Sequence, residues 1–354
     1  MKFRNIGDVL LVSPIFENLK SYYHDLQIDI AVNKGTEDMV AKNPFIDNVI
    51  VYERDRIRSM PLLKKLKEEL KFILSFRKSN YDIVINLTKG ERGGFIAGFS
   101  GASVRMGYEG KGLFLKKIYT HHLPSTKGKH TVESNLNLLR LLKIPILHKK
   151  VKIYWDQDDE EVITKKLKNH EKFIHLHPVS RWRFKCISDH TMAKVVDFCE
   201  LKLKTKVVIT ASPLSEEIDK IESILKICKS KPINFSGKLS LSETAALNKR
   251  ARFFIGVDTA VMHISAANNT PVLAFFGPSG AHQWGPWDNN LLGSGYNNIN
   301  GVQSMGIHTV ISESRSCQPC GKDGCDGSKI SDCLMNINFD LIEENINKYM
   351  TLHP

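Results

Sequence analysis

The sequence alternates between short runs rich in β-branched residues and stretches with helical periodicity, such as 14–24 and 61–78. The strand-like runs are IDIAV (28–32), NVIVY (48–52), YDIVINL (81–87), FIHLH (173–177), KVVIT (206–210), RFFIGV (252–257) and PVLAFF (271–276). Alternation of this kind is typical of parallel sheets covered by helices on both faces. The chain of 354 residues is long enough for two such units. The sequence therefore predicts an α/β protein with two Rossmann-like domains, joined near residues 143–161.

Positive charge is concentrated in the first half of the chain. Residues 1–150 hold 26 Lys and Arg against 15 Asp and Glu, an excess of 11, whereas residues 151–354 hold 24 against 23. Such an asymmetry indicates an anionic partner for the first half. Charge alone does not choose among nucleic acid, a phosphorylated glycan and an anionic membrane.

Composition excludes several other classes. No stretch approaches the roughly 20 continuous apolar residues of a membrane span, and the N-terminus lacks the pattern of a secretory signal. We therefore expect a cytoplasmic protein. Seven cysteines, an odd number, make a disulfide framework unexpected there.

The segment FFIGVDTAVMHISAANNTPVLAFFGPS (253–279) contains two strand-like runs that each end in a turn of small residues. Asp258 and Thr259 precede a helical stretch, and Ala260 leaves its first-turn N–H groups open to a ligand. Asp258 and Thr259 could simply cap the helix. With His263 one turn further on, the pattern favours a phosphate site at the helix N-terminus.

A second turn carries cations after a strand-like run, in HLHPVSRWRFKC (175–186). Arg181, Arg183 and Lys185 lie where ligands bind in open α/β sheets, beyond a strand's carboxyl end. Several cations opposite a helix N-terminus suit a diphosphate. The alternative is a solvated basic loop, which Trp182 among the cations makes less attractive.

Four segments carry a resemblance to a known family. NIGDVLLVSP (5–14), HPVSRWRFK (177–185), SGKLSLSETAALNKRARFFIGVDTAVMHISAA (236–267) and FGPS (276–279) occur in the order and spacing of glycosyltransferase family 9, the ADP-heptose:lipopolysaccharide heptosyltransferases. The chain looks most like the heptosyltransferase III branch. The resemblance implies a GT-B fold with an acceptor-binding domain (1–150), a nucleotide-sugar domain (151–337) and a final helix (338–354) that packs back toward the first domain.

The resemblance also implies site residues. Asp8 matches the family's proposed general base, Lys185 its lysine on the donor phosphates, and Ser180 a polar residue of the same turn. The donor-binding aspartate and its turn match Asp258, Thr259 and Ala260, and we add Arg181, Arg183 and His263 from their positions.

The chemistry implied by the resemblance is inverting transfer of heptose from ADP-heptose to the lipid A–core oligosaccharide, with no cofactor and no metal required. Glycosyl transfer needs a base near the acceptor hydroxyl and positive charge near the departing diphosphate. We expect a monomer that associates peripherally with the cytoplasmic face of the inner membrane and binds no nucleic acid.

Residues 53–79 form a basic amphipathic segment, with Leu62, Leu66, Leu70, Ile73 and Leu74 on one helical face. We expect this face to pack on the core. The basic face could in addition contact anionic lipid or acceptor phosphates.

Cysteines cluster near the C-terminus as Cys317-x2-Cys320-x4-Cys325-x7-Cys333. The spacing matches neither common zinc fingers nor ferredoxins, so a structural metal and a loop of reduced thiols are both open.

Two other functions stay open at this stage. A nucleotide-sugar 2-epimerase would use the same cleft without an acceptor, and a basic nucleic-acid-binding protein would explain the charge, although no such motif is recognisable. Adenine and ribose contacts have only regional candidates, Glu216, Glu217 and the turn 236–240.

The turn with Asp8 follows only three residues, Met1 to Phe3. Relatives of the family carry an apolar strand there, so we expect a truncated first strand. Either the true start lies upstream of Met1, which we favour, or this copy of the protein has lost the strand.

Overall fold

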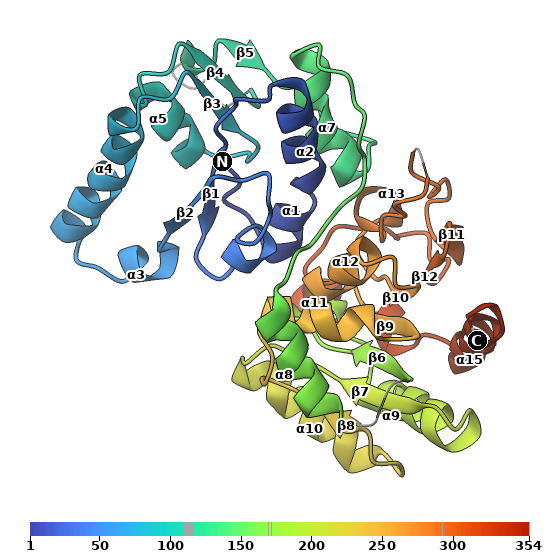
Figure 1. The fold of residues 1–354 in the computed structure, drawn as a ribbon. Coiled ribbons are helices and arrows are strands. Elements are labelled where there is room, and N and C mark those ends of the chain that lie inside the picture. The colour runs from blue at the N-terminus through green and yellow to red at the C-terminus, as the bar shows by residue number, and fades with distance from the viewer. Residues whose placement is uncertain (110–116, 169, 171, 292, 354) are drawn as a thin grey trace. The chain divides into compact units, whose positions relative to one another are not determined.

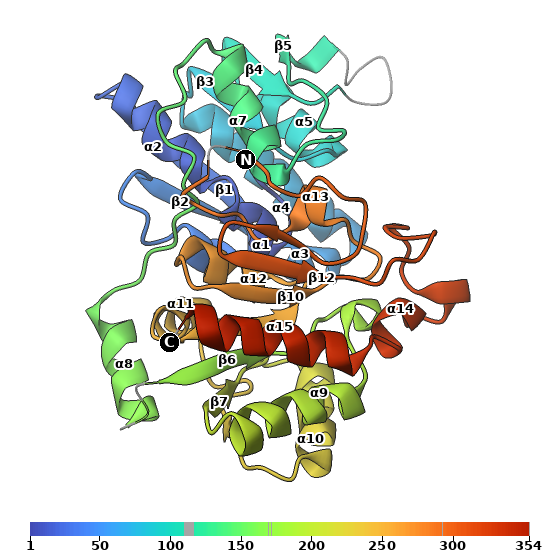
Figure 2. The ribbon, with the colours of Figure 1, turned by 90° about the vertical axis from the view of Figure 1, so that its right-hand side faces the viewer.

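The computed structural model describes residues 1–109, 117–168, 170, 172–291 and 293–353, shown as ribbons in Figures 1 and 2. The chain divides into two compact units. The first comprises Met1–Lys127 and Thr131–Lys149, and the second comprises Gly128–His130 and Lys150–Pro354. Both units are α/β, as the alternating pattern predicts. In the described part of the chain, no helix combines the length and the apolar character needed to cross a bilayer.

The first unit contains two small parallel sheets. Strands β1 (Asp29–Asn33) and β2 (Asn48–Tyr52) form one, and β3 (Ile83–Asn86), β4 (Val104–Gly107) and β5 (His121–His122) form the other. The helices of this unit are α1 (Ile6–Leu10), α2 (Ser13–Tyr22), α3 (Arg54–Arg58), α4 (Leu62–Lys78), α5 (Glu91–Phe99) and α7 (Thr131–Leu141), with a 3-10 turn at Glu37–Met39. Helices α2 and α7 pack against each other (Figure 1).

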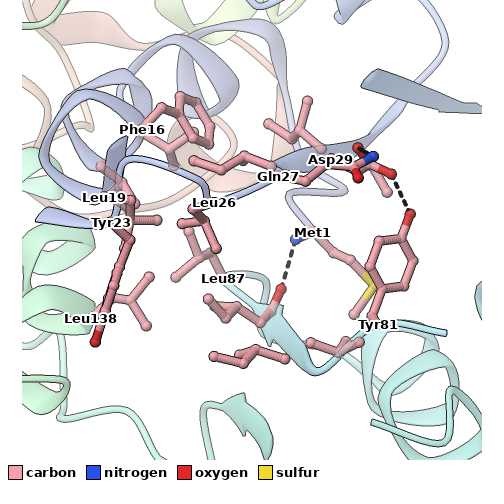
Figure 3. Close-up of a pocket in the computed structure, with 18 of the residues that line it drawn as sticks. Met1, Phe16, Leu19, Tyr23, Leu26, Gln27, Asp29, Tyr81, Leu87 and Leu138 are labelled. Atoms are coloured by element: carbon pink, nitrogen blue, oxygen red, sulfur yellow. Dashed lines mark hydrogen bonds between the residues drawn. The ribbon is translucent and has the colours of Figure 1, made fainter. Parts of the chain in front are cut away.

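The first residues of the chain contact both small sheets. Lys2 forms an isolated parallel bridge with Val32, and its N–H donates to the Ala31 carbonyl at 2.9 Å. On the other side, the Met1 ammonium donates to the Ile85 carbonyl at 2.6 Å (Figure 3). Met1 and Lys2, which the sequence suggests as the end of a strand, therefore do pair like a strand, but only over these two residues.

The second unit is built on one seven-stranded sheet in the order β11-β12-β10-β9-β6-β7-β8. Its strands are β6 (Phe173–His177), β7 (Lys206–Ile209), β8 (Ile233–Asn234), β9 (Phe253–Val257), β10 (Val272–Phe275), β11 (Gln303–Met305) and β12 (His308–Ile311). All neighbours pair in parallel except β11 with β12.

Helices cover both faces of this sheet, because its buried strands are apolar on both sides. The helices are α8 (Gln157–Leu167), α9 (Asp189–Asp197), α10 (Ser215–Ile227), α11 (Leu241–Lys249), α12 (Ala260–Ala267), α13 (Ala281–Trp284), α14 (Asp332–Met335) and α15 (Phe339–Leu352); shorter helical turns span Arg183–Lys185, Phe198–Lys202 and Cys325–Gly327. Ile174 and Leu176 of β6 pack in the core with α9, α10 and α15, whereas Phe173 packs on the other face with α8 and α11.

The last helix, α15, lies along the second unit (Figure 2). The Tyr349 hydroxyl donates to the Val272 carbonyl of β10 at 2.6 Å, and Ile342 and Ile346 are buried in the same core. That this helix packs back toward the first unit stays a prediction.

The expectation that the leucine face of α4 packs on the core is wrong. Leu62, Leu66 and Leu70 are 69%, 56% and 55% exposed. The helix instead buries Phe76 and packs Phe72 against the core, and of the predicted face Ile73 also packs there. One helix therefore carries two apolar stripes, and the sequence pattern could not tell which one faces inward.

Candidate active site

The chain reverses its course across the second sheet between β6 and β9. From β6 it proceeds to β7 and β8 on one side, and it then returns to β9, β10 and β12 on the other. Strands β6 and β9 are parallel neighbours, with His177 opposite Gly256. Their carboxyl ends therefore open at one edge, which is the topological switch point where open α/β sheets bind ligands.

Lys185 and Asp258 meet at this edge. Asp258 follows β9 directly, and Lys185 ends the 3-10 turn Arg183–Lys185 beyond β6. The Lys185 Nζ lies 2.6 Å from Asp258 Oδ2 and 3.4 Å from the Asp258 carbonyl. Their side chains are 23% and 7% exposed, so the carboxylate is largely buried and the ammonium is partly open to solvent. The pair keeps a cation at the switch point.

Helix α12 starts beside this pair, with Thr259 at its N-cap and Ala260 first in the helix. Within the described residues, the buried Thr259 Oγ1 and His263 Nδ1 have no hydrogen-bond partner. Burial lowers the pKa of His263 to about 4; nearby Asp258 opposes this shift and Lys185 adds to it. His263 is therefore neutral at physiological pH. Two unpaired buried polar atoms at a helix N-terminus are suited to receive an anionic oxygen-rich ligand.

The loop between β6 and Lys185 adds exposed positive charge. The Ser180 hydroxyl accepts from the Trp182 N–H at 3.1 Å, which tightens the turn. The Arg181 guanidinium lies 4.8 Å from the centre of the Trp182 ring, and Trp182 in turn stacks on Phe184. Arg183 is exposed. The aromatic pair thus orders a loop with two arginines at the same edge.

A buried polar network that we did not foresee from the sequence lies beneath this edge. The Thr210 hydroxyl bonds to His175 at 2.8 Å and to His177 at 2.9 Å. Burial lowers the pKa of His175 to about 3 and that of His177 to about 4. In the sequence, the run HLH at the end of a strand-like segment was the only feature that pointed to this network.

Glu216 and Glu217, regional candidates for nucleoside contacts, differ in position. Glu217 is buried and its Oε2 accepts from the Ser212 N–H at 2.9 Å, which holds the loop after β7. Glu216 is exposed and bonds with Ser215. Glu217 therefore has a structural contact, and the nucleoside contacts stay unassigned.

Asp8 belongs to the first unit, in the short helix α1, whereas the other eight catalytic and donor-binding candidates belong to the second. Lys2 Nζ lies 3.9 Å from Asp8 Oδ1 and donates to the Leu87 carbonyl at 3.2 Å. Burial lowers the pKa of Lys2 to about 8, while Asp8 partly opposes that shift. Lys2 is a neighbour of the predicted base that we did not single out from the sequence.

The four C-terminal cysteines are spread between surface and core. Cys317 and Cys320 are exposed, Cys325 is half-buried and Cys333 is buried; burial raises the pKa of Cys333 to about 11. Over the described ranges, no three His, Cys, Asp or Glu side chains are grouped so as to hold a metal ion. The structure therefore gives no support to the metal alternative.

Cations and a helix N-terminus at the switch point of a doubly wound sheet are typical of nucleotide-binding α/β proteins. The sequence model described as glycosyltransferase family 9 (heptosyltransferase) matches residues 70–306. The chain belongs to this family. It is 31% identical over 296 residues to lipopolysaccharide heptosyltransferase 3 of Escherichia coli (strain K12), with 81% of this chain and 84% of that protein covered.

Solved structures confirm the predicted GT-B fold. The glycosyl transferase family 9 protein from Veillonella parvula DSM 2008 superposes with a TM-score of 0.81 at 20% identity, covering 99% of this chain and 96% of that one. The ADP-heptose lipopolysaccharide heptosyltransferase II of E. coli superposes with a TM-score of 0.75 at 16% identity, covering 99% and 97%.

Proposed function

We propose that this protein transfers heptose from ADP-heptose to the inner core of lipopolysaccharide, in the manner of a heptosyltransferase III. The observation that carries the proposal is its 31% identity to lipopolysaccharide heptosyltransferase 3 across most of both chains. The pairing of Lys185 with Asp258 at the switch point supports it, because a nucleotide sugar needs a cation there.

In this proposal the second unit binds the donor. The ADP diphosphate accepts hydrogen bonds from Lys185, the Thr259 hydroxyl and the first N–H groups of α12, with Arg181 or Arg183 adding charge from the loop. Neutral His263 contributes a hydrogen bond without adding a charge. Fixed donors aimed at a charge that grows in the transition state lower the barrier most effectively. Since these groups are cationic or dipolar, we propose that transfer requires no metal.

Asp8 acts as the general base in the same proposal. The acceptor hydroxyl oxygen forms a bond to the anomeric carbon, the bond from that carbon to the diphosphate oxygen breaks, and ADP leaves with the electron pair. The hydroxyl proton passes to Asp8. A single displacement of this kind inverts the anomeric centre. A carboxylate is a weak base, so proton transfer comes late, once bond formation has acidified the hydroxyl. Lys2 Nζ, 3.9 Å from Asp8 Oδ1, places a cation beside this carboxylate.

We further propose that the enzyme acts as a monomer at the cytoplasmic face of the inner membrane. Helix α4 supports membrane contact, because its exposed leucines stand beside exposed lysines, among them Lys64, Lys67 and Lys71. An apolar stripe bordered by cations is the pattern of helices that lie in the surface of anionic bilayers.

The test is ADP release from ADP-heptose, with and without lipopolysaccharide truncated before the side-branch heptose. We expect ADP release and a mass gain of one heptose on the acceptor only when both substrates are present. ADP release that is independent of acceptor, or epimerised nucleotide sugar as product, would contradict the proposal.

A further inference from the structure

Residues 315–334, which lead from β12 into α14 and contain the four clustered cysteines, contact two turns at the carboxyl edge of the second sheet (Figure 2). We call this segment the strap. One turn is the basic loop after β6, and the other follows β10. Strand β9 lies between β6 and β10 in the sheet, so the two turns flank the strand that carries Asp258 at its end.

The strap is joined to the basic loop by a buried hydrogen bond. The Ser331 hydroxyl donates to the Phe184 carbonyl at 2.7 Å, and Ser331 is only 2% exposed. Ser331 stands at the N-cap of α14 but makes no capping bond with its side chain. Serine at such a position ordinarily accepts from an N–H group of its own helix. Its hydroxyl instead fixes the backbone of the residue that precedes Lys185.

The strap also holds the turn after β10. Gln318 Nε2 donates to the Gly277 carbonyl at 3.1 Å, and the Gly321 N–H donates to the Pro278 carbonyl at 2.9 Å. Gln318 is buried. A Cβ atom on Gly277 would lie 2.6 Å from Leu334 Cδ1, so the absence of a side chain at Gly277 lets Leu334 pack directly on this turn.

The basic loop needs such external support to keep one conformation. Arg181, Arg183 and Lys185 place three like charges within five residues, and their repulsion opposes a compact loop. Fixing the backbone of each loop residue also costs conformational entropy. A ligand that binds a loop already held in place loses less entropy than one that must order it.

We propose that the strap preorganises the donor site, with Ser331 and Gln318 as positioning residues that act through the backbone of Phe184 and Gly277. This inference rests on the proposed binding of ADP-heptose at this edge. A donor that binds only the ordered turns favours the closed strap by the same factor by which the closed strap favours the donor. Opening of the strap and loss of donor affinity are therefore linked.

The first test compares two serine variants of the strap. Ser331→Ala should raise the dissociation constant of ADP, measured by calorimetry, and the KM for ADP-heptose about tenfold. The kcat at saturating donor should stay within about twofold, because bound donor selects the ordered turns. Gln318→Ala should act in the same direction.

Two further variants control for a merely structural effect. Ser331→Thr keeps the hydroxyl and should restore ADP affinity. Ser328→Ala is the matched control, because the exposed Ser328 bonds only within the strap, to the Cys325 and Ile330 carbonyls. Normal ADP affinity in Ser331→Ala, an equal loss in Ser328→Ala, or a lower kcat with unchanged affinity would overturn the proposal.

The second test measures opening of the strap directly. Cys333 is 7% exposed, and a Cβ atom on Gly277 would lie 3.5 Å from its Sγ, so its thiol reacts only when the strap leaves the turn. Alkylation of Cys333 by iodoacetamide is followed by mass spectrometry of its peptide. Saturating ADP should slow this reaction in the unmodified protein, and Ser331→Ala should accelerate it about tenfold without ligand. An alkylation rate that bound ADP leaves unchanged would refute the link.

The alkylation measurement also separates this inference from the proposed function. A protein with no affinity for ADP would contradict the proposed function. The rates of Ser331→Ala and Ser328→Ala without ligand would still decide whether Ser331 holds the strap, and equal rates would refute that role.

Discussion

Lys185 Nζ and Asp258 Oδ2 lie 2.6 Å apart, on loops that follow two neighbouring parallel strands. The two residues are far apart in sequence, and they meet because β9 pairs with β6. The ion pair therefore ties the basic loop to the N-terminus of α12, the two elements that we propose to hold the donor diphosphate.

Lys185→Ala should lower kcat/KM for ADP-heptose by about 10²–10³, the cost of removing one preorganised donor from a developing anion. ADP affinity, measured by calorimetry, should fall as well. The buried Asp258 also loses its partner, so the thermal midpoint should decrease. Lys226→Ala, at an exposed lysine of α10, is the matched control. A variant at Lys185 with normal kinetics would remove it from the donor site.

Asp8→Asn should lower kcat by about 10²–10⁴, because the acceptor proton loses its base. ADP affinity should stay within about twofold, since we propose that the second unit alone binds the donor. Asp82→Asn, at an exposed aspartate before β3, should retain full activity. If Asp8→Asn transferred heptose at the normal rate, another group would have to be the base.

Acid should destabilise the second unit between about pH 6.5 and pH 4. The pKa values of His175, His177 and His263 are lowered to about 3, 4 and 4 by burial. In that window the unfolded chain binds protons that the folded chain excludes, so stability falls as pH falls. Each histidine contributes up to about 1.4 kcal/mol per pH unit. Urea unfolding at pH 7.5 and pH 5 measures this loss of stability. His177→Asn should reduce the number of protons taken up on unfolding in this pH range by about one. If His177→Asn left the dependence of the unfolding free energy on pH unchanged, groups other than His177 would take up these protons.

Replacing Leu66 and Leu70 together by Ser should weaken binding to vesicles of phosphatidylglycerol and phosphatidylethanolamine at least about tenfold. Turnover with a soluble, delipidated acceptor should not change. Leu201 and Leu214 are each 43% exposed in the second unit, and their double Ser variant serves as the control. Equal vesicle binding by both double variants would exclude α4 as the membrane contact.

Chelation should leave transfer unaffected, because we assign charge neutralisation to Lys185 and α12. The measurement is initial rate before and after dialysis against EDTA, followed by addition of Mg²⁺. A loss of rate that Mg²⁺ restores would contradict the assignment.

The strand–helix alternation predicted two α/β units because apolar strands such as β6, β7, β9 and β10 are distinct from the helices between them. The GT-B fold was expected from the resemblance to the family. It also identified both turns at the switch point, since cations and a capping pair follow those strands directly. The strands β4, β5, β8 and β11 are short and contain few consecutive β-branched residues, so no run marked them.

Other features depended on tertiary contacts that periodicity cannot show. Helix α4 has two candidate apolar faces, and Phe72 and Phe76 rather than Leu66 and Leu70 pack inward because the aromatic residues Phe3 and Tyr52 lie there. The sequence suggests Lys2 only as part of a strand end, whereas the fold places its ammonium 3.9 Å from Asp8.

The strand order around β6 has a consequence for biosynthesis of the chain. Lys185 and Asp258 are 73 positions apart, and β7 and β8 are synthesised between them but add to the opposite side of β6. A nascent or proteolysed fragment that ends before β9 therefore carries the basic loop without its counter-ion or the helix N-terminus. The ion pair forms only after a loop of this length has closed, and closing it carries an entropic cost. Affinity for ADP would thus report whether translation and folding of this unit have been completed.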